Sequence, residues 1–402
     1  MTDIVESAEV STLLDELTRM TGREDPYPRY HRLREISPLV RADDGVLVLT
    51  RHADCAAITR NPKIGHMPQH MFDFVVPGWS DHPALRLLFT SILNLNPPDH
   101  TRLRRLVSSS FTPRRVQELR PSIERMVGDL LDAMDGGTDF VTAFAFPLPV
   151  NVIGELLGVP EADRAQFQQL VRDWTQVLER IDEDVLATAD PAAAQIRSYL
   201  ADLVHERRRQ PTDDLLSALV AAEEDGDKLT EDELLTMAGL LFAAGFETTT
   251  NLLANSVVAL LDNPSQVTLL RDKPEIAKDA VEELLRYDTP VQLLARVTWD
   301  DVQVGGVPVS GGERIVAYLG AGNRDPQRFA DPDRLDLTRP DNAPLSFGGG
   351  IHYCLGAPLA RLEAEIALPA LVRRFPGLAL AGDPVRRDSL TLRGYTSLPI
   401  TS

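Results

Sequence analysis

The ten residues from Phe347 to Gly356 read FGGGIHYCLG, and this stretch decides how the rest of the chain is interpreted. Its three successive glycines, Gly348 to Gly350, permit left-handed or very tight backbone and leave no side chains between the loop and whatever lies against it. Cys354 comes directly before a segment of helical character, Ala357 to Phe375. The free amides and the dipole at a helix N-terminus favour a thiolate, which can ligate a soft or borderline metal.

Three interpretations of Cys354 compete at this point. A lone cysteine in a glycine-rich turn is most often a packing residue. A zinc site would require partner cysteines nearby, and the only other cysteine of the chain is Cys55. Haem iron takes a single proximal protein ligand, so one thiolate beside a glycine-rich cradle fits haem.

The stretch resembles the haem-binding loop of the cytochrome P450 superfamily, and every defining position of that motif is filled. The resemblance implies a haem b cofactor, with Cys354 as the axial ligand of the iron and with Phe347 and Gly348 against the haem. It also implies the P450 prism fold, mainly α with small β-sheets (α+β), and a single domain over residues 1–402. The chain is most similar to soluble bacterial, actinobacterial-like members of the superfamily.

A long central helix is predicted independently of that resemblance. Thr230 and Glu233 form a capping box, and an apolar run follows without a breaker as far as Asn263-Pro264. The predicted helix, Glu231 to Asp262, has about 32 residues and a length of roughly 48 Å. Its middle is apolar on nearly all sides, so it should run through the core. The resemblance implies that it crosses above the haem.

An acid and three threonines interrupt the apolar middle of this helix, in the sequence Ala244-Gly-Phe-Glu-Thr-Thr-Thr250. Burying polar groups inside a helix costs free energy of desolvation, so their presence here points to a function. The Thr248 hydroxyl can bond back to the Ala244 carbonyl four residues earlier. By the resemblance, Glu247 relays protons and Thr248 steadies the iron-bound dioxygen, while Ala244 and Gly245 lie against the haem.

A second helix, from near Pro274 to before Pro290, carries Glu283 and Arg286 on one face at i,i+3. The ordinary interpretation is a surface ion pair worth about 0–1 kcal/mol. The resemblance instead implies a buried structural pair that is locked to a third arginine, and Arg334 matches that partner.

The haem propionates are carboxylates in a dry pocket, so they require charged donors. His100 and Arg104 lie at i,i+4 on one helical face, and His352 precedes the axial cysteine by two residues. These three residues and Arg296 match the propionate ligands of the family. His66 and His70 are given no role, because the proline between them argues against a helix and hence against a metal pair.

The bulk composition agrees with a globular enzyme. The chain has 402 residues with 41 Lys+Arg against 60 Asp+Glu, a net charge of −19 that disfavours binding to nucleic acid.

Strands are expected at Pro38–Arg41, Val46–Thr50 and within Val302–Leu319, where paired glycines favour hairpins. The N-terminus is not a signal peptide and no apolar run is long enough for a membrane span, so a soluble cytoplasmic protein, a monomer by family analogy, is expected.

The function implied is monooxygenation, in which one oxygen atom of O2 enters a C–H or C=C bond of the substrate by hydroxylation or epoxidation. A large apolar substrate is expected. The overall similarity of the chain to actinobacterial members of the family favours the tailoring of a secondary metabolite such as a macrolide or other polyketide. The expected pocket residues are Phe72, Leu88, Val291, Leu294 and Tyr395.

The electron donors implied are a ferredoxin and a ferredoxin reductase. Residues 101–120 carry six arginines and one glutamate, so Arg102, Arg105, Arg114 and Arg115 are expected to receive an acidic ferredoxin. Two alternatives remain: a peroxygenase that uses hydrogen peroxide directly, and a non-catalytic haem-binding protein. The pair Glu247 and Thr248 argues against both, because neither needs a proton relay.

Overall fold

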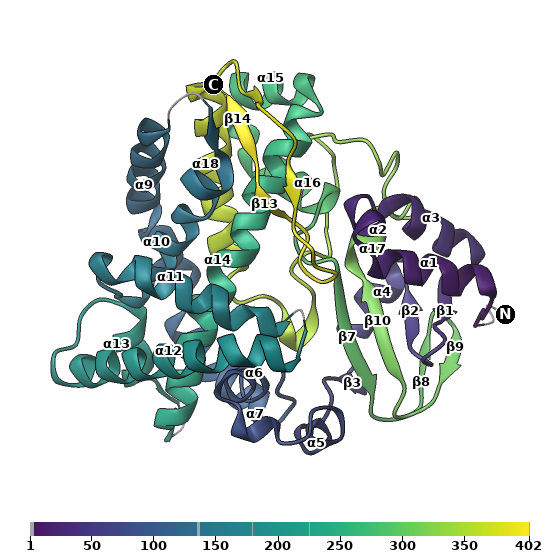
Figure 1. Cartoon of the computed structure of the whole chain (residues 1–402), viewed down its shortest axis with the longest axis horizontal. Coiled ribbons are helices and arrows are strands. Elements are labelled where there is room, and N and C mark those ends of the chain that lie inside the picture. Colours follow the sequence, from purple (N-terminus) through teal and green to yellow (C-terminus); the bar gives the residue numbers. More distant parts are fainter. Residues whose placement is uncertain (1–3, 135–136, 179, 225, 402) are drawn as a thin grey trace.

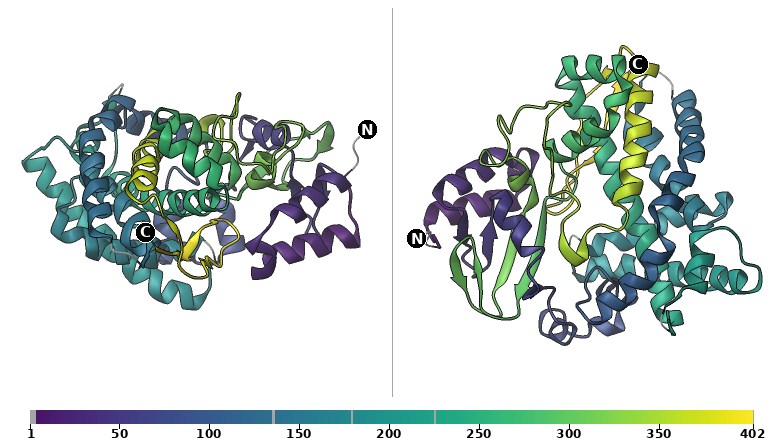
Figure 2. Two further views of the ribbon diagram at one scale, coloured as in Figure 1. Left: turned by 90° about the horizontal axis from the view of Figure 1, so that it is seen from above. Right: turned by 180° about the vertical axis from the view of Figure 1, so that it is seen from behind.

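The computed structural model describes residues 4–134, 137–178, 180–224 and 226–401. Helices make up most of the molecule, and the largest sheet lies at one side with the N-terminal helices beside it (Figure 1). The views from above and from behind show the same division (Figure 2). The mainly helical fold with small sheets that the sequence predicts is confirmed.

The α-helices are α1 (Ala8–Thr18), α2 (Met20–Glu24), α3 (Tyr27–Ile36), α4 (His52–Ile58), α5 (Phe72–Val75), α6 (Pro83–Phe89), α7 (Asp99–Ser110), α8 (Pro113–Glu118), α9 (Arg120–Ala133), α10 (Pro147–Leu157), α11 (Glu161–Thr175), α12 (Glu183–Arg209), α13 (Leu215–Ala221), α14 (Glu231–Leu261), α15 (Pro264–Asp272), α16 (Ala277–Tyr287), α17 (Leu319–Asn323) and α18 (Ala357–Arg374). The strands are β1 (Leu39–Arg41), β2 (Leu47–Leu49), β3 (Ile64–Gly65), β4 (Thr138–Asp139), β5 (Glu223–Glu224), β6 (Asp227–Lys228), β7 (Leu293–Thr298), β8 (Val302–Val304), β9 (Val307–Val309), β10 (Arg314–Tyr318), β11 (Ala379–Leu380), β12 (Val385–Arg386), β13 (Tyr395–Ser397) and β14 (Pro399–Thr401).

The largest sheet has the strand order β1-β2-β10-β7-β3. Strands β2 and β10 are parallel, and the other neighbours are antiparallel. The strands expected near residues 38–50 and 302–319 are present as β1, β2, β8, β9 and β10. Strand β7 was not predicted, and its pairing places Arg296 opposite Ile315.

The predicted long helix is α14, which ends one residue earlier than expected and carries the predicted capping box of Thr230 and Glu233. Most of its residues, 22 of 31, are buried, in agreement with the apolar composition of its middle. It runs through the helical body beside α18 (Figure 1), and it also contacts α10, α16, α12 and α6. Side chains from these neighbouring helices therefore pack against α14.

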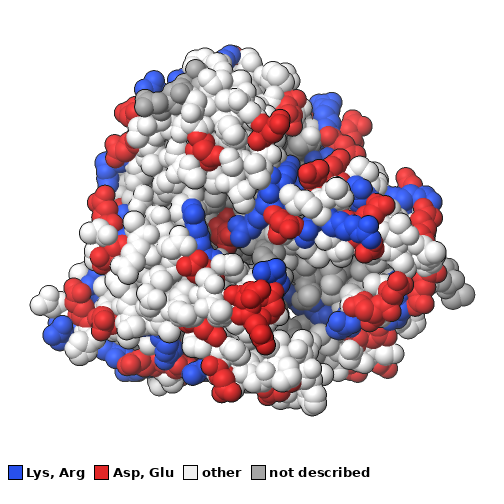
Figure 3. Space-filling view, viewed as in Figure 1, with Lys and Arg blue, Asp and Glu red and all other residues white. Residues whose placement is uncertain are grey.

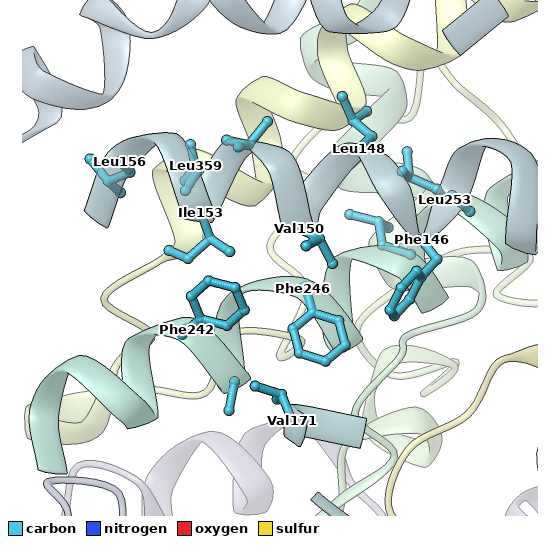
Figure 4. Packing of buried hydrophobic residues seen from close by; sticks show 14 of the residues in the cluster. Phe146, Leu148, Val150, Ile153, Leu156, Val171, Phe242, Phe246, Leu253 and Leu359 are labelled. Carbon is cyan, nitrogen blue, oxygen red and sulfur yellow. The ribbon is translucent and has the colours of Figure 1, made fainter. Parts of the chain in front are cut away.

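Close packing of α10 on α14 explains the glycine in the middle of α14. A β-carbon at Gly245 would lie 3.1 Å from Cγ1 of Ile153, so a larger residue would press on α10. Figure 4 shows Ile153 facing α14 beside the ring of Phe242, while the ring of Phe246 extends from α14 toward Val171 of α11. The apolar contacts on both sides hold this part of α14 in place.

No single helix within the described residues is long and apolar enough to cross a membrane. One bent pair, Val141–Leu157 with Glu161–Leu178, meets the length and composition criteria together, with an angle of 115° between its halves.

Candidate active site

The glycine-rich loop has the tight conformation that its sequence allows. Gly348 and Gly350 have φ angles of +67° and +63°, values that favour glycine. A β-carbon at Gly350 would stand 2.0 Å from the carbonyl oxygen of Thr59, so this glycine also permits a close backbone approach. The amide of Cys354 donates to the carbonyl of Phe347 at 3.0 Å, which closes the loop three residues before α18.

The surroundings of Cys354 combine desolvation with hydrogen-bond donors. Desolvation raises the pKa of the thiol, and the amides of Gly356 and Ala357 and the charge of Arg104 act in the opposite direction. Both cysteines of the chain are free. Within the described ranges, no group of three or more His, Cys, Asp or Glu residues is arranged to hold a metal ion. Cys354 is thus suited to be the single protein ligand of a metal, as in haem, and not part of a zinc site.

Three histidines lie in a row beside the loop. The ring centroids of His66 and His352 are 4.6 Å apart, and those of His352 and His100 are 4.1 Å apart. Buried ring nitrogens of all three have no hydrogen-bond partner among the described residues. Desolvation, together with neighbouring positive charges, lowers the pKa to about 2 for His66, about 3 for His352 and about 4 for His100. Each imidazole is therefore a neutral group with an unused donor or acceptor.

Two arginines flank this histidine row. Arg104 donates to the carbonyl of Tyr353 at 2.8 Å, and Arg296 donates only to the adjacent Ala295 carbonyl at 2.7 Å. Desolvation lowers the pKa of Arg296 to about 10. Within the part of the chain that the structure describes, the hydrogen bonds of both guanidinium groups go to main-chain carbonyls and not to carboxylates. His100 is buried, and the other members of the cluster are half-buried. Two arginines without acidic partners among the described residues, beside imidazoles that can donate hydrogen bonds, suit an anionic ligand such as the two propionates of a haem.

The pair of Glu283 and Arg286 is buried, and both side chains have 0% exposure. Arg286 donates from Nε and Nη2 to the two carboxylate oxygens of Glu283 at 2.7 and 2.8 Å. Arg286 also donates to three main-chain carbonyls, those of Asn323, Pro332 and Arg334. The expected buried pair on α16 is therefore present, and it joins this helix to the segment before the cysteine loop.

The third arginine of this network is Arg339, so the assignment of Arg334 was wrong. The Arg339 Nε atom lies 3.1 Å from both carboxylate oxygens of Glu283. The Arg334 side chain is 65% exposed and pairs with Asp336 instead. Arg334 takes part in the network through its main-chain carbonyl, which accepts hydrogen bonds from Arg286 and Arg339. Its side chain points outward, so the guanidinium that contacts Glu283 beside Arg286 is that of Arg339.

The polar residues of α14 are placed as the sequence suggests. The Thr248 hydroxyl donates to the Ala244 carbonyl at 3.1 Å, the predicted bond, and Thr249 donates to the Gly245 carbonyl at the same distance. Glu247 is only 7% exposed. It pairs with Arg387, a residue that the sequence did not indicate.

The expected substrate-pocket residues have different surroundings in the structure. Phe72 stacks on Phe89 with centroids 4.1 Å apart, and Leu88 is buried in α6. The most exposed of the large apolar residues in this loop is Phe74, at 83%. Tyr395 is buried beneath the guanidinium of Arg386, 4.0 Å from its ring centroid. Val291 and Leu294 are partly buried against the sheet core, so substrate contact by these five residues stays a prediction.

His66 is a candidate ligand that the sequence reasoning dismissed. Its main chain is fixed by Asn96, whose side chain bonds both the amide and the carbonyl of His66 at 2.9 and 3.0 Å. Trp299 Nε1 also donates to that carbonyl, at 3.3 Å. His66 directly follows strand β3, so it reaches the cluster from a loop and not from the helix that the proline argued against.

A lone cysteine thiol just before α18 and a half-buried basic cluster without acidic partners among the described residues fit a haem-thiolate protein. Comparison with known proteins agrees, because the cytochrome P450 family model matches residues 141–388. Cytochrome P450 107B1 of Saccharopolyspora erythraea is 43% identical over 391 residues, which cover 94% of this chain and 95% of that protein. The polyketide biosynthesis cytochrome P450 PksS of Bacillus subtilis is 40% identical, covering 94% and 96%.

A solved structure shows the same fold. P450BioI in complex with an acyl carrier protein ligated to hexadec-9Z-enoic acid superposes with a TM-score of 0.88 at 37% identity, covering 95% of this chain and 99% of that one. The chain belongs to the cytochrome P450 family and has its fold. It is a bacterial-type cytochrome P450 monooxygenase, and the family implies a haem-thiolate cofactor.

Proposed function

We propose that the chain binds haem b with Cys354 as the axial ligand and with the propionates held by the basic cluster. That cluster consists of His66, His100, Arg104, Arg296 and His352. The observation that carries the proposal is the set of buried nitrogens in this cluster that have no partner among the described residues. When bound, the haem supplies the activation of dioxygen, and the axial thiolate favours O–O cleavage.

The test of this proposal is spectroscopic. Reduced protein exposed to carbon monoxide should show the strongly red-shifted Soret band of thiolate ligation, and Cys354→Ser should lose it. Cys55→Ser is the matched control and should keep the band, because Cys55 is fully buried in a different apolar cluster. A wild-type spectrum typical of histidine ligation would refute the assignment of Cys354.

Protons for oxygen cleavage are proposed to pass through Glu247 and Thr248. The support is their adjacency on α14, together with a Thr248 hydroxyl that is held by the Ala244 carbonyl. Thr248→Ala should consume reductant and release peroxide, and Glu247→Gln should slow turnover and enlarge the solvent isotope effect. Thr249→Ala is the control hydroxyl, and its coupling should stay close to that of the wild type. Unchanged coupling in both main variants would exclude this route.

The substrate class proposed is a large apolar molecule, such as a macrolide or another polyketide, tailored by hydroxylation or epoxidation. PksS, a relative named for polyketide biosynthesis, supports this class, while the acyl-carrier complex of P450BioI shows a fatty acyl chain instead. Screening a library of both classes for ligands that displace the water on the iron distinguishes them. A shift of the Soret band with fatty acids alone would exclude the polyketide proposal.

Electron transfer from a ferredoxin and its reductase is proposed, with an amended docking surface. Arg102 is engaged by Asp227 and Glu233, so it is not available to a partner as the sequence suggested. Arg115 likewise pairs with Asp213. Arg114 pairs with Glu118, but its side chain is 88% exposed and so stays accessible to a partner. Arg114→Glu should slow reduction by ferredoxin at low salt more than at high salt. Reduction that is indifferent to both salt and this reversal would place the docking surface elsewhere.

A further inference from the structure

Glu247 and Arg387 form an ion pair that joins the central helix to the C-terminal end of the chain. The guanidinium Nη1 of Arg387 contacts Oε1 of Glu247, and the Glu247 side chain is 9% exposed. The second oxygen, Oε2, is buried without a hydrogen-bond partner among the described residues. One oxygen of this acid is thus fixed by a cation, while the other is free to bind a proton.

The position of Arg387 is itself built by the fold. Arg387 directly follows β12, and its amide donates to the carbonyl of Gly394 at 3.0 Å, just before β13. Gly394 lies against Asn251 of α14, because a β-carbon at Gly394 would stand 1.9 Å from Oδ1 of Asn251. Asn251 is one helical turn beyond Glu247, on the same side of α14. The hairpin is therefore fastened to α14 next to the acid that Arg387 contacts.

One other cation reaches the same acid. Arg172 of α11 lies 3.7 Å above the ring of Phe146, which in turn contacts Phe246, as Figure 4 shows for the two rings. Desolvation lowers the pKa of Arg172, and the charge of Glu247 opposes that effect. Asp173, beside Arg172, accepts a hydrogen bond from Gln169 of the same helix at 2.9 Å.

These contacts identify the charges around Glu247. Among the described residues, the cations that interact with Glu247 are Arg387 from the C-terminal hairpin and Arg172 from α11. Helix α10 presents apolar side chains such as Ile153 to this part of α14. In the space-filling view, basic and acidic side chains both border the central hollow of this face (Figure 3). Of the two cations, only Arg387 makes a direct ion pair with the acid.

We propose that Arg387 is a positioning residue for Glu247: it fixes one carboxylate oxygen and leaves Oε2 to accept and release a single proton. The inference rests on the proton-relay role proposed above for Glu247. A proton from solvent forms an O–H bond at Oε2, and the same bond breaks when the proton moves on. Arg387 keeps its own protons throughout, and no electrons are exchanged within the pair.

The test is infrared difference spectroscopy of the haem-loaded protein as a function of pH. The C=O band of protonated Glu247 is identified as the band that Glu247→Gln abolishes. In Arg387→Gln, the titration midpoint of this band should rise by about one pH unit or more, because a neighbouring opposite charge favours the ionised acid. Arg387→Lys retains the charge and should bring the midpoint back toward the wild-type value.

Two further variants keep the test decisive. Arg387→Met removes the charge but keeps a long side chain, so it should shift the midpoint as Arg387→Gln does, and it replaces that variant if the glutamine form loses haem. Arg172→Gln is the matched control and should shift the midpoint less. An unchanged midpoint in the Arg387 variants, or a larger shift in Arg172→Gln, would overturn the proposal.

A second readout separates this inference from the relay itself. Peroxide released per NADH consumed is measured with a surrogate ferredoxin and ferredoxin reductase and without an added substrate. If Glu247→Gln leaves this ratio unchanged, the relay role fails. If Glu247→Gln changes the ratio but Arg387→Gln does not, the positioning role alone fails. In a Glu247→Gln background, Arg387→Gln should add no further change, whereas a merely structural arginine would still have an effect.

Discussion

Gly350 lies directly against the main-chain carbonyl of Thr59, and a β-carbon at this glycine would stand 2.0 Å from that oxygen. The contact joins the cysteine loop to the end of α4, which belongs to the sheet-bearing side of the molecule. Because Gly350 also has a φ of +63°, two independent constraints exclude a larger residue. The cysteine loop is therefore shaped by its neighbour as well as by its own sequence.

Gly350→Ala should lower the free energy of unfolding and the haem content together. The left-handed backbone alone costs roughly 1–2 kcal/mol for a residue with a β-carbon, and the close approach to Thr59 adds to it. Gly312→Ala is the control, because Gly312 has a φ of +89° but a β-carbon there would have no neighbouring atom within 4 Å. Urea unfolding and haem absorbance check both variants, and equal losses would contradict the role of the Thr59 contact.

Arg339→Gln should destabilise the protein by about 3 kcal/mol or more, because a buried carboxylate loses one of its two cations. Arg334→Gln should change the free energy of unfolding by no more than about 1 kcal/mol, since its side chain is 65% exposed and its pair with Asp336 lies at the surface. Urea denaturation of the two variants provides the comparison. The reverse order of stability would restore Arg334 as the inner partner.

His66→Phe should make haem leave the protein about tenfold faster, because the propionate loses one hydrogen-bond donor. The transfer of haem to an excess of a haem-free acceptor protein measures the rate. His70→Phe is the control, since His70 is exposed and the ring contacts of the histidine row join only His66, His352 and His100 among the described residues. Equal rates for the two variants would remove His66 from the site.

Asp288 provides a pH test of stability. Arg393, Arg386 and the Tyr27 hydroxyl contact its carboxylate and hold its pKa below the usual range, against the effect of desolvation. A depressed carboxyl pKa contributes stability that is present above about pH 4 and is lost as the pH falls through the folded-state value.

Asp288→Asn should therefore be less stable than the wild type at neutral pH by about 3 kcal/mol, with a constant difference down to about pH 5. Below about pH 4 the difference should narrow, because the wild type also loses its charged acid there. Urea midpoints at several pH values check this. A difference that stays constant into the acid range would show that Asp288 does not act through its charge.

The sequence by itself determined the features whose partners lie close together along the chain. The cysteine loop, the capped helix α14 with the bond from Thr248 to Ala244, and the pair of Glu283 and Arg286 all depend on spacings of a few residues. At such spacings the helix geometry fixes which side chains meet, so a pattern of residue types is sufficient to predict the contact.

Only the tertiary structure decided the contacts that join distant segments. Which arginine turns inward to Glu283 depends on the path of the chain after Pro332, which places the carbonyl of Arg334 and the side chain of Arg339 at the network. His66 reaches the basic cluster through Asn96, and Arg387 reaches Glu247 from the far end of the chain. Loops and hairpins have no fixed period, so their side-chain directions follow from packing against other elements, which residue order alone does not specify.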